Sequence, residues 1–361
     1  MTSTAVRLTP TAMPAAGPAP GPECPDVLIV GGGPAGCTAA IALAELGWSV
    51  TLLEKAQHPR FHIGESLLPM NMPILERLGV LEDVRGIGVL KRGADFPNDS
   101  GGYNTFRFSH ALDAKADFAF QVPRAQFDHV LFQRARARAM GVDAREQVCV
   151  EQVAFDGEHP VLQARTADGG VQQFRPRYLL DASGRDTFLG NRLKLKRANA
   201  THQSAALFSH FRGVARRPGE DAGNISIYRH AHGWMWLIPL PEDIMSVGAV
   251  CYPDYMKTRQ GDSEGFLMRT LALNAELNAR MLGAGACHRQ LRLRMHAHGR
   301  AALVDAGGCL HLRRPDVLLW RVPGHARRRT WRSDGGCGTA RTAVGGKTAA
   351  RAAARTDARR G

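Results

Sequence analysis

Three glycines and one glutamate near the start of the chain have the spacing of a phosphate-binding turn. Gly31, Gly33 and Gly36 stand in G-x-G-x-x-G spacing directly after an apolar run, and Glu54 follows 18 residues after Gly36. In such a turn the first glycine makes a tight bend, the second lets a pyrophosphate approach the backbone, and the third lets a helix pack on a strand. A carboxylate at Glu54 can accept hydrogen bonds from ribose hydroxyls. These four residues predict a dinucleotide site.

The elements that must position this turn are a strand, a helix and a second strand. Val27 to Val30 and Val50 to Leu53 are apolar runs, and the stretch between them has helical composition as far as Leu46. The free N–H groups at the start of that helix would face the phosphates. This order predicts an α/β fold with a Rossmann-like, three-layer dinucleotide-binding domain.

The segment HPRFHIGESLLP then replaces the alternating strands and helices of a dehydrogenase. It resembles the flavin strap of the FAD-dependent halogenases, a branch of the p-hydroxybenzoate-hydroxylase-like monooxygenase superfamily, and the resemblance runs from about Asp26 to Met281. It implies FAD as the cofactor and a flavin lined by Arg60, Ile63, Glu65 and Ser66. On chemistry alone, Glu65 is also suited to the N-terminus of a helix before Pro69.

A later segment, QVPRAQFDHVLFQRARARAMGV, predicts a helix that begins with Pro123 and ends at Gly141. The superfamily has an arginine in a matching V-x-R-x-x-F/L-D segment that reaches FAD, which implies this role for Arg124. The alternative is a charge on a surface helix. The strand and turn at RYLLDASG lack the superfamily's usual D-G pair, so we assign Asp181 no cofactor contact.

The stretch GWMWLIP holds two of the five tryptophans in the chain. Period-two alternation predicts a strand, with Met235 and Leu237 on the face opposite to the tryptophans. The stretch fits the W-x-W-x-I-P pattern of the halogenases, whose bulky residues separate flavin from substrate. The resemblance thus implies a partition made by Trp234, Trp236, Ile238 and Pro239. The alternative is an ordinary strand of a substrate-side sheet.

Lys91 stands on a predicted strand before two small residues, so its ammonium can reach across a pocket. By context it matches the halogenase lysine that hydrogen-bonds hypohalous acid or forms a haloamine, which implies a catalytic role. The alternative is a solvated charge beside Arg92. The sequence contains no metal-ligand spacing, and we expect no metal site.

The resemblance implies an oxidoreductase that uses FADH2, O2 and halide to halogenate a small electron-rich aromatic. This substrate is a phenol, a pyrrole or a group tethered to a carrier protein. No NAD(P)H-binding unit is visible in the sequence, so we expect a separate flavin reductase. One alternative is a flavin monooxygenase that hydroxylates or epoxidises directly. Another is a non-catalytic flavoprotein remnant with a basic tail.

The chain divides into five expected regions. Residues 1–23 form a disordered leader, 24–90 and 119–200 the FAD-binding domain, 91–118 and 201–284 a mixed β-sheet substrate domain, and 285–361 a basic, disordered tail. In the substrate domain, Ser263 to Met281 predict one capped helix whose inward side chains are Phe266, Leu267, Thr270 and Leu271.

The tail differs in composition from the rest. It contains sixteen arginines, one lysine and four aspartates, so it carries +13 of the net charge of +14, and it lacks Phe and Tyr. Permissible codons for its first part, read one nucleotide later, can restore the superfamily's G-D-A segment and the halogenases' F-S-S-G turn in family order. We therefore hypothesise an out-of-frame tail, starting between about Met281 and Cys287. A chain translated this way would lack the halide site and part of the FAD site.

Composition excludes other classes of protein. The charge is confined to a tail without interleaved aromatics, so we expect no nucleic-acid partner. No stretch approaches the roughly 20 apolar residues of a membrane span. Seven cysteines at wide spacings, without a C-x-x-C pair, indicate reduced thiols, and we expect a cytoplasmic protein.

Overall fold

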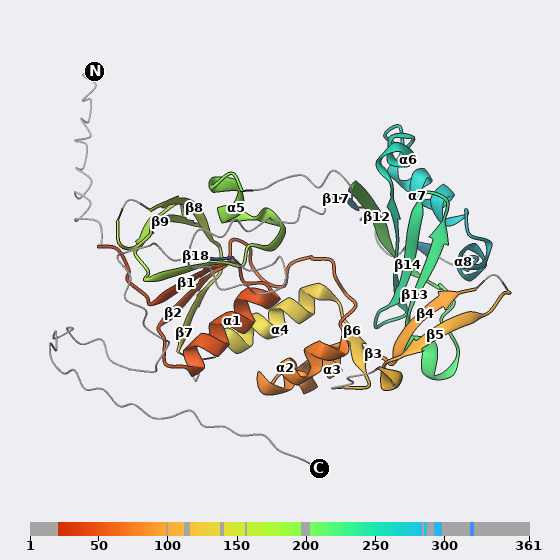
Figure 1. Cartoon of the computed structure of the whole chain (residues 1–361), viewed down its shortest axis with the longest axis horizontal. Helices are drawn as coiled ribbons and strands as arrows, with labels where there is room; N and C mark the ends of the chain where they lie inside the picture. Colours follow the sequence, from red (N-terminus) through yellow and green to blue (C-terminus); the bar gives the residue numbers. More distant parts are fainter. Residues whose placement is uncertain are drawn as a thin grey trace, which may run out of the picture. The chain divides into compact units, whose positions relative to one another are not determined.

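The computed structural model describes residues 21–98, 100–111, 116–137, 141–155, 157–195 and 203–283, together with the strand segments 285–286, 292–297 and 318–320. Figure 1 labels most of its helices and strands, numbered in chain order. In the described residues, no helix is both long and apolar enough to cross a membrane.

The first sheet is built on the predicted strand–turn–helix–strand unit. Its central strand β1 (Val27–Val30) pairs in parallel with β2 (Val50–Leu53) and β11 (Tyr178–Asp181), and β7 (Val142–Arg145) pairs in parallel with β2. Every residue of β1 and β2 is buried, as expected of parallel strands covered on both faces.

Two further layers cover this sheet. Helices α1 (Pro34–Glu45) and α4 (Arg124–Arg136) lie side by side on one face (Figure 1), where they share a core with the inward side chains of β1 and β2. The other face packs on an antiparallel sheet made of β8 (Val148–Ala154), β9 (Val161–Thr166) and β10 (Val171–Phe174). The predicted three-layer α/β fold is confirmed.

Short elements lead from this domain to the substrate sheet. The strap is followed by η1 (Pro69–Asn71), α2 (Met72–Arg77) and α3 (Leu81–Ile87). Strand β3 (Val89–Lys91) then pairs antiparallel with β6 (Ala119–Gln121). Lys91 therefore lies at the end of a strand, as predicted.

The substrate sheet has the order β16-β12-β15-β14-β13-β4-β5, and β17 also pairs with β12. Its strands are β4 (Gly93–Pro97), β5 (Tyr103–Arg107), β12 (Gln203–Arg212), β13 (Ile225–His230), β14 (Gly233–Pro239), β15 (Ile244–Cys251), β16 (Gly285–Ala286) and β17 (Arg292–Ala297). Only the β4–β13 pairing is parallel among these strands, so the sheet is mixed as expected. The smaller elements of both domains are η2 (Phe108–His110), η4 (Gly184–Asp186), α5 (Phe188–Arg192), η5 (Gly219–Gly223) and α6 (Pro253–Lys257).

The helix predicted over Ser263–Met281 is wrong in its length. It is divided into α7 (Ser263–Leu271) and α8 (Ala275–Arg280), because the side chain of Asn274 accepts a hydrogen bond from the Leu277 amide and starts a new helix. The cap at the start is present, since Asp262 accepts from Gly265 N. The four side chains predicted to face inward are all buried.

Residues of the expected leader and of the expected tail make contacts with the two domains. Glu23, placed at the end of the leader, pairs its carboxylate with Arg145 at 2.6 Å and its backbone with Gln173. Three segments of the tail join sheets: β16 and β17 pair with β12, and β18 (Leu318–Trp320) pairs antiparallel with β11. The rest of 285–361 lies outside the described residues, so its predicted disorder and shifted frame stay predictions.

Candidate flavin site and active site

The glycine turn has the packing that its spacing predicts. Gly31 has φ +110°, and a Cβ there would lie 2.4 Å from the carbonyl oxygen of Ala182. A Cβ on Gly36 would lie 1.9 Å from the carbonyl oxygen of Gly31, so only glycine lets α1 approach the turn. A Cβ on Gly33 would have only the Arg60 guanidinium near it, at 3.7 Å. The backbone at Gly33 therefore has room for a ligand to approach.

Glu54 is a buried carboxylate at the end of β2. Its oxygens accept hydrogen bonds from Gly32 N at 2.8 Å, from Ala56 N at 2.9 Å and from Arg60 Nη2 at 3.0 Å. Burial alone would raise the pKa of Glu54, but the hydrogen bond and charge of Arg60, together with the two amides, hold this pKa below its ordinary value. Since a carboxylate has about four acceptor positions, one remains for a ribose hydroxyl.

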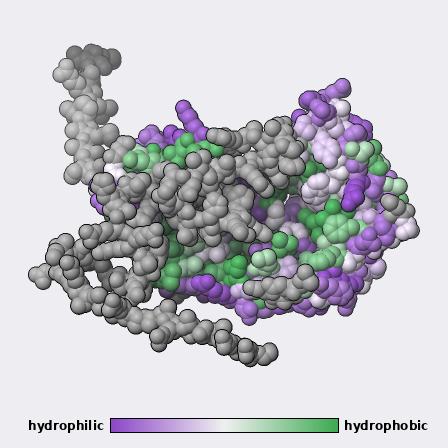
Figure 2. Space-filling model, in the orientation of Figure 1, coloured by the Kyte–Doolittle hydropathy of each residue, from purple (hydrophilic) through white to green (hydrophobic). Residues whose placement is uncertain are grey.

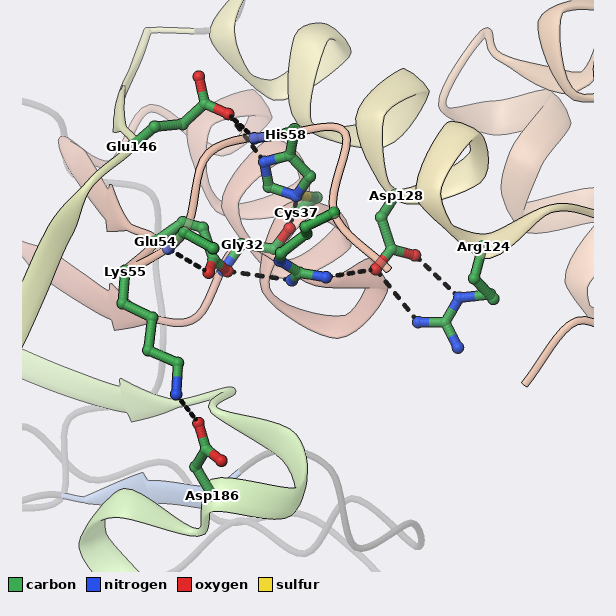
Figure 3. A network of polar contacts seen from close by, with 11 residues as sticks. Gly32, Cys37, Glu54, Lys55, His58, Arg124, Asp128, Glu146 and Asp186 are labelled. Atoms are coloured by element: carbon green, nitrogen blue, oxygen red, sulfur yellow. Dashed lines mark hydrogen bonds and ion pairs between the residues drawn. The ribbon is translucent and has the colours of Figure 1, made fainter. Parts of the chain in front are cut away.

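Asp128 joins the two arginines that the sequence assigns to the flavin, and Figure 3 shows its contact with Arg124. Arg60 Nη1 donates to its Oδ2 at 2.9 Å, and Arg124 donates through Nε to Oδ1 at 2.9 Å and through Nη2 to Oδ2 at 3.2 Å. The Asp128 side chain is fully buried. Asp128 is the last residue of the quoted V-x-R-x-x-F/L-D segment but was assigned no role from the sequence, although its position four after Arg124 on a predicted helix was a usable signal.

The strap lies against this network. Arg124 Nη1 donates to the carbonyl oxygen of Ile63, and Ile63, Gly64 and Ser66 line a cavity of about 1630 Å³ with the glycine turn and Glu54. Glu65 is different: its side chain lines a second cavity of about 200 Å³, where His210 Nε2 lies 2.7 Å from its Oε1. Glu65 is therefore part of the strap, as predicted, but its carboxylate faces the substrate sheet.

The larger cavity also has apolar walls. It is lined by one side of α1, including Ala35, Ala39 and Ala42, and by Leu68 and Ile74 near α2. Its volume exceeds the roughly 300–1,000 Å³ of common ligand pockets. Figure 2 shows apolar surface exposed among hydrophilic residues on the drawn face, and Leu68, Met70 and Ile74 are among the exposed large apolar side chains.

These residues fit FAD. The open backbone at Gly33, the remaining acceptor position on Glu54 and the start of α1 all belong to one cavity. The buried Nε of Arg60 has no hydrogen-bond partner in the described part of the chain, although this residue lines the same cavity. A buried donor without a partner is costly, and a phosphate or ribose oxygen of a bound dinucleotide would supply the missing acceptor.

Lys91 is buried, with 2% of its surface exposed. Its ammonium donates to Ser66 Oγ at 2.8 Å and to the carbonyl oxygen of Leu67 at 3.1 Å, and it lies 5.1 Å from the centre of the Phe108 ring. Burial lowers the pKa of Lys91 to about 8. The alternative of a solvated surface charge is therefore wrong, and the lysine touches the strap directly.

The tryptophan strand β14 alternates as predicted. Met235 and Leu237 are buried in the core that α7 covers, while Trp236 lies on the opposite face against Phe208, with ring centres 6.2 Å apart. Phe208 in turn stacks on Phe61 of the strap at 6.1 Å. An aromatic row thus connects the strap with the tryptophan strand.

The partition residues differ in exposure. Trp234 is 41% exposed, whereas Ile238 and Pro239 are buried. None of the four predicted partition residues lines either cavity described above. Their role as a wall between flavin and substrate stays a prediction.

Two other expectations from the sequence concern Asp181 and metal binding. The Asp181 carboxylate, to which we assigned no cofactor contact, accepts hydrogen bonds from Ser183 N at 3.0 Å and Leu189 N at 2.7 Å and so stabilises its own turn. The part of the chain that the structure describes contains no group of three His, Cys, Asp or Glu side chains that could hold a metal ion.

Comparison with known proteins identifies the domain. The model of the family described as "FAD binding domain" matches residues 25–266. Over 244 residues the chain is 35% identical to the tryptophan 2-halogenase of Chondromyces crocatus, covering 66% of this chain and 45% of that protein. It is 31% identical over 250 residues to the 1H-pyrrole-2-carbonyl-[peptidyl-carrier protein] chlorinase of Pseudomonas fluorescens, covering 62% of this chain and 55% of that protein.

A solved structure agrees with these relatives. The myxobacterial chondrochloren halogenase CndH is 32% identical, with a TM-score of 0.70, over 76% of this chain and 64% of that one. The chain spans about half the length of the two curated relatives. FAD is the cofactor that the matched domain binds. The chain thus belongs to the FAD binding domain family and, within it, is similar to flavin-dependent halogenases.

Proposed function

We propose that this chain is an FAD-dependent oxidoreductase of the halogenase type. It would use FADH2, O2 and halide to halogenate an electron-rich aromatic that is phenolic, a pyrrole or tethered to a carrier protein. The observation that carries this proposal is the buried Lys91 ammonium held against the strap through Ser66. A hydroxylase that transfers oxygen directly to its substrate does not require such a buried cation.

The residues of the chain have separate tasks in this proposal. Bound FAD, once reduced, supplies the activation of oxygen that oxidises halide to hypohalous acid. The backbone at Gly33 and the start of α1 receive the pyrophosphate, Glu54 accepts from the ribose, and Arg60 offers its unpaired Nε to the cofactor. Asp128 keeps both arginines in place.

Lys91 is proposed to orient the oxidised halogen. With a pKa of about 8 it is mostly protonated at neutral pH, so its ammonium can donate a hydrogen bond to the oxygen of hypohalous acid. Because of this low pKa, a larger fraction of Lys91 is in the neutral amine form than for a surface lysine. Formation of a haloamine would need this neutral form. Both states support transfer of halogen to an electron-rich ring.

The partners follow from the same chemistry. We propose that a separate flavin reductase supplies FADH2, as the resemblance to FAD-dependent halogenases implies. Two relatives are named as enzymes that act on a pyrrole carried by a peptidyl carrier protein, which supports including a tethered aromatic among the substrates to test. We propose the cytoplasm as the compartment, since the cysteines are widely spaced and unpaired in the described residues.

The test is an assay with reduced flavin, O2 and chloride or bromide, using a panel of free and carrier-tethered phenols and pyrroles. The chain as given and its in-frame counterpart are both assayed, and products are identified by mass. Halogenated product that disappears in Lys91→Ala, while FAD stays bound, is the expected result. Hydroxylated product without halogenated product would favour the direct monooxygenase instead.

A further inference from the structure

At the second, smaller cavity the strap has another contact with the substrate sheet, between Glu65 and His210. Neighbouring residues of the strap face different spaces: Gly64 and Ser66 line the larger cavity, whereas Glu65 lines the smaller one with Phe61, Phe208 and His210. The strap turns at Gly64, which has φ +103°, and then pairs at Ser66 with Gln121 of β6. The carboxylate of Glu65 is thus directed at the face of β12.

Glu65 and His210 form a hydrogen-bonded pair that joins two domains. His210 Nε2 lies 2.7 Å from Glu65 Oε1, and only 3% of Glu65 is exposed. Because a buried carboxylate that loses its partner is strongly unfavourable, this hydrogen bond fixes the direction of the side chain. The residues are 145 positions apart in sequence, so the contact ties the strap to the substrate sheet.

His210 is itself held in place. Its backbone pairs with Ser246 of β15 inside the sheet, and its ring lies 6.2 Å from that of Phe61. The strap residue on the other side of the pair is equally fixed, since the carbonyl oxygen of Glu65 accepts from Val122 N at 2.8 Å. The pair therefore connects two ordered pieces of backbone.

The next residue of the strap makes the connection to chemistry. Ser66 Oγ accepts the hydrogen bond from the Lys91 ammonium at 2.8 Å, and the following carbonyl, of Leu67, accepts a second at 3.1 Å. A strap that shifts at Glu65 would move both acceptors away from Lys91. We propose that His210 is a positioning residue. It acts through Glu65 to hold Ser66 against Lys91, and so keeps this lysine buried with its ammonium hydrogen-bonded to the strap.

Only the catalytic consequence of this inference rests on the proposed function. The first test therefore measures the accessibility of Lys91 and does not require enzyme activity. Lys91 in the full chain is acylated with a small anhydride, and the labelling rate is read by mass spectrometry, with the exposed Lys257 as internal reference. Two variants differ in reach. His210→Gln places an amide N–H near the original Nε2, whereas the shorter His210→Asn cannot reach Glu65.

The expected result is that Lys91 is labelled about tenfold faster or more in His210→Asn, a factor that corresponds to about 1.4 kcal/mol, near the upper end of the range of about 0.5–1.5 kcal/mol for one ordinary hydrogen bond. His210→Gln should label at the wild-type rate. The control variant His232→Gln changes an exposed ring that stacks on Tyr255 and should not alter Lys91. Equal rates in the Asn and Gln variants, or an unchanged rate in His210→Asn, would overturn the proposal.

A second measurement adds the catalytic meaning. With reduced flavin and bromide, free hypobromous acid is caught by a small diketone in solution, and the caught fraction is compared with halogenated aromatic product. His210→Asn should raise the caught fraction, and His210→Gln should restore it. An unchanged fraction in His210→Asn would refute the catalytic meaning of the pair. If no variant and no wild-type protein oxidises halide, the proposed function fails, while the labelling rates still decide whether His210 positions Lys91.

Discussion

Replacing Asp128 by asparagine tests the network between the ribose acceptor and the strap. The carboxylate is fully buried and accepts three hydrogen bonds from Arg60 and Arg124. Asparagine keeps the shape but removes the charge, and its NH2 group would face a guanidinium. The variant therefore leaves two partly buried cations without their shared counter-ion, and both arginines become free to shift.

The size of the effect follows from what each arginine keeps. Removing one partner of a buried ion pair costs about 3–5 kcal/mol. Arg60 still has Glu54 and Arg124 still has the Ile63 carbonyl, so we expect a smaller loss than this range, about 2–3 kcal/mol in the free energy of unfolding. FAD affinity should fall about tenfold or more, since 1.4 kcal/mol of lost positioning is sufficient for that factor.

The assay combines urea unfolding with FAD titration followed by flavin absorbance. The matched control is Asp95→Asn in the substrate sheet, because Asp95 is also fully buried and accepts from Thr105 at 2.8 Å, from Asn224 at 3.2 Å and from Arg217 at 3.3 Å. The control should lose stability without losing FAD affinity. Normal FAD binding in Asp128→Asn, or an equal loss in the control, would refute the reasoning.

Three further predictions concern the cofactor site, Lys91 and the tail. Glu54→Ala removes the ribose acceptor and Gly33→Val places a side chain where pyrophosphate must approach, so both should weaken FAD binding, and normal flavin content in both would contradict the site. For Lys91, the folded pKa of about 8 lies below the ordinary 10.5, so the unfolded chain binds more protons between these values. Stability should therefore rise from pH 8 to 10.5 by up to about 3 kcal/mol. This rise, measured by urea midpoints, should be absent in Lys91→Met. In the coding DNA around codons 281–288, a one-nucleotide change should open a frame through the G-D-A and F-S-S-G segments, and a shifted frame with neither motif would end the frame hypothesis.

Local signals predicted the part of the site that lies close together in sequence. The glycine turn, the position of Glu54 at the end of β2 and the alternation of the tryptophan strand all follow from spacing within one or two elements, and the structure places these residues there, while their contacts with FAD stay predictions. The burial of Lys91 was not visible in the same way, because a lysine beside Arg92 has the local pattern of a solvated strand end.

Contacts between distant segments could not be predicted from one sequence. His210 meets Glu65 across 145 residues, and nothing in the local pattern of β12 indicates which strap residue it faces. The break between α7 and α8 was missed for another reason. Helical periodicity continues through this stretch, but the side chain of Asn274 bonds the Leu277 amide, so local capping outweighs the continuous apolar pattern.

Gly248 on β15 sits opposite Trp236 in the sheet register and has a consequence for how this protein can change over time. A Cβ at position 248 would lie 2.3 Å from the indole of Trp236 and 2.6 Å from the Cβ of Phe208. The three residues thus share one volume, and enlarging the glycine requires a smaller aromatic beside it. Substitutions at Gly248 should therefore arise together with a smaller side chain at Trp236 or Phe208, and a library that varies Trp236 alone will miss these paired changes.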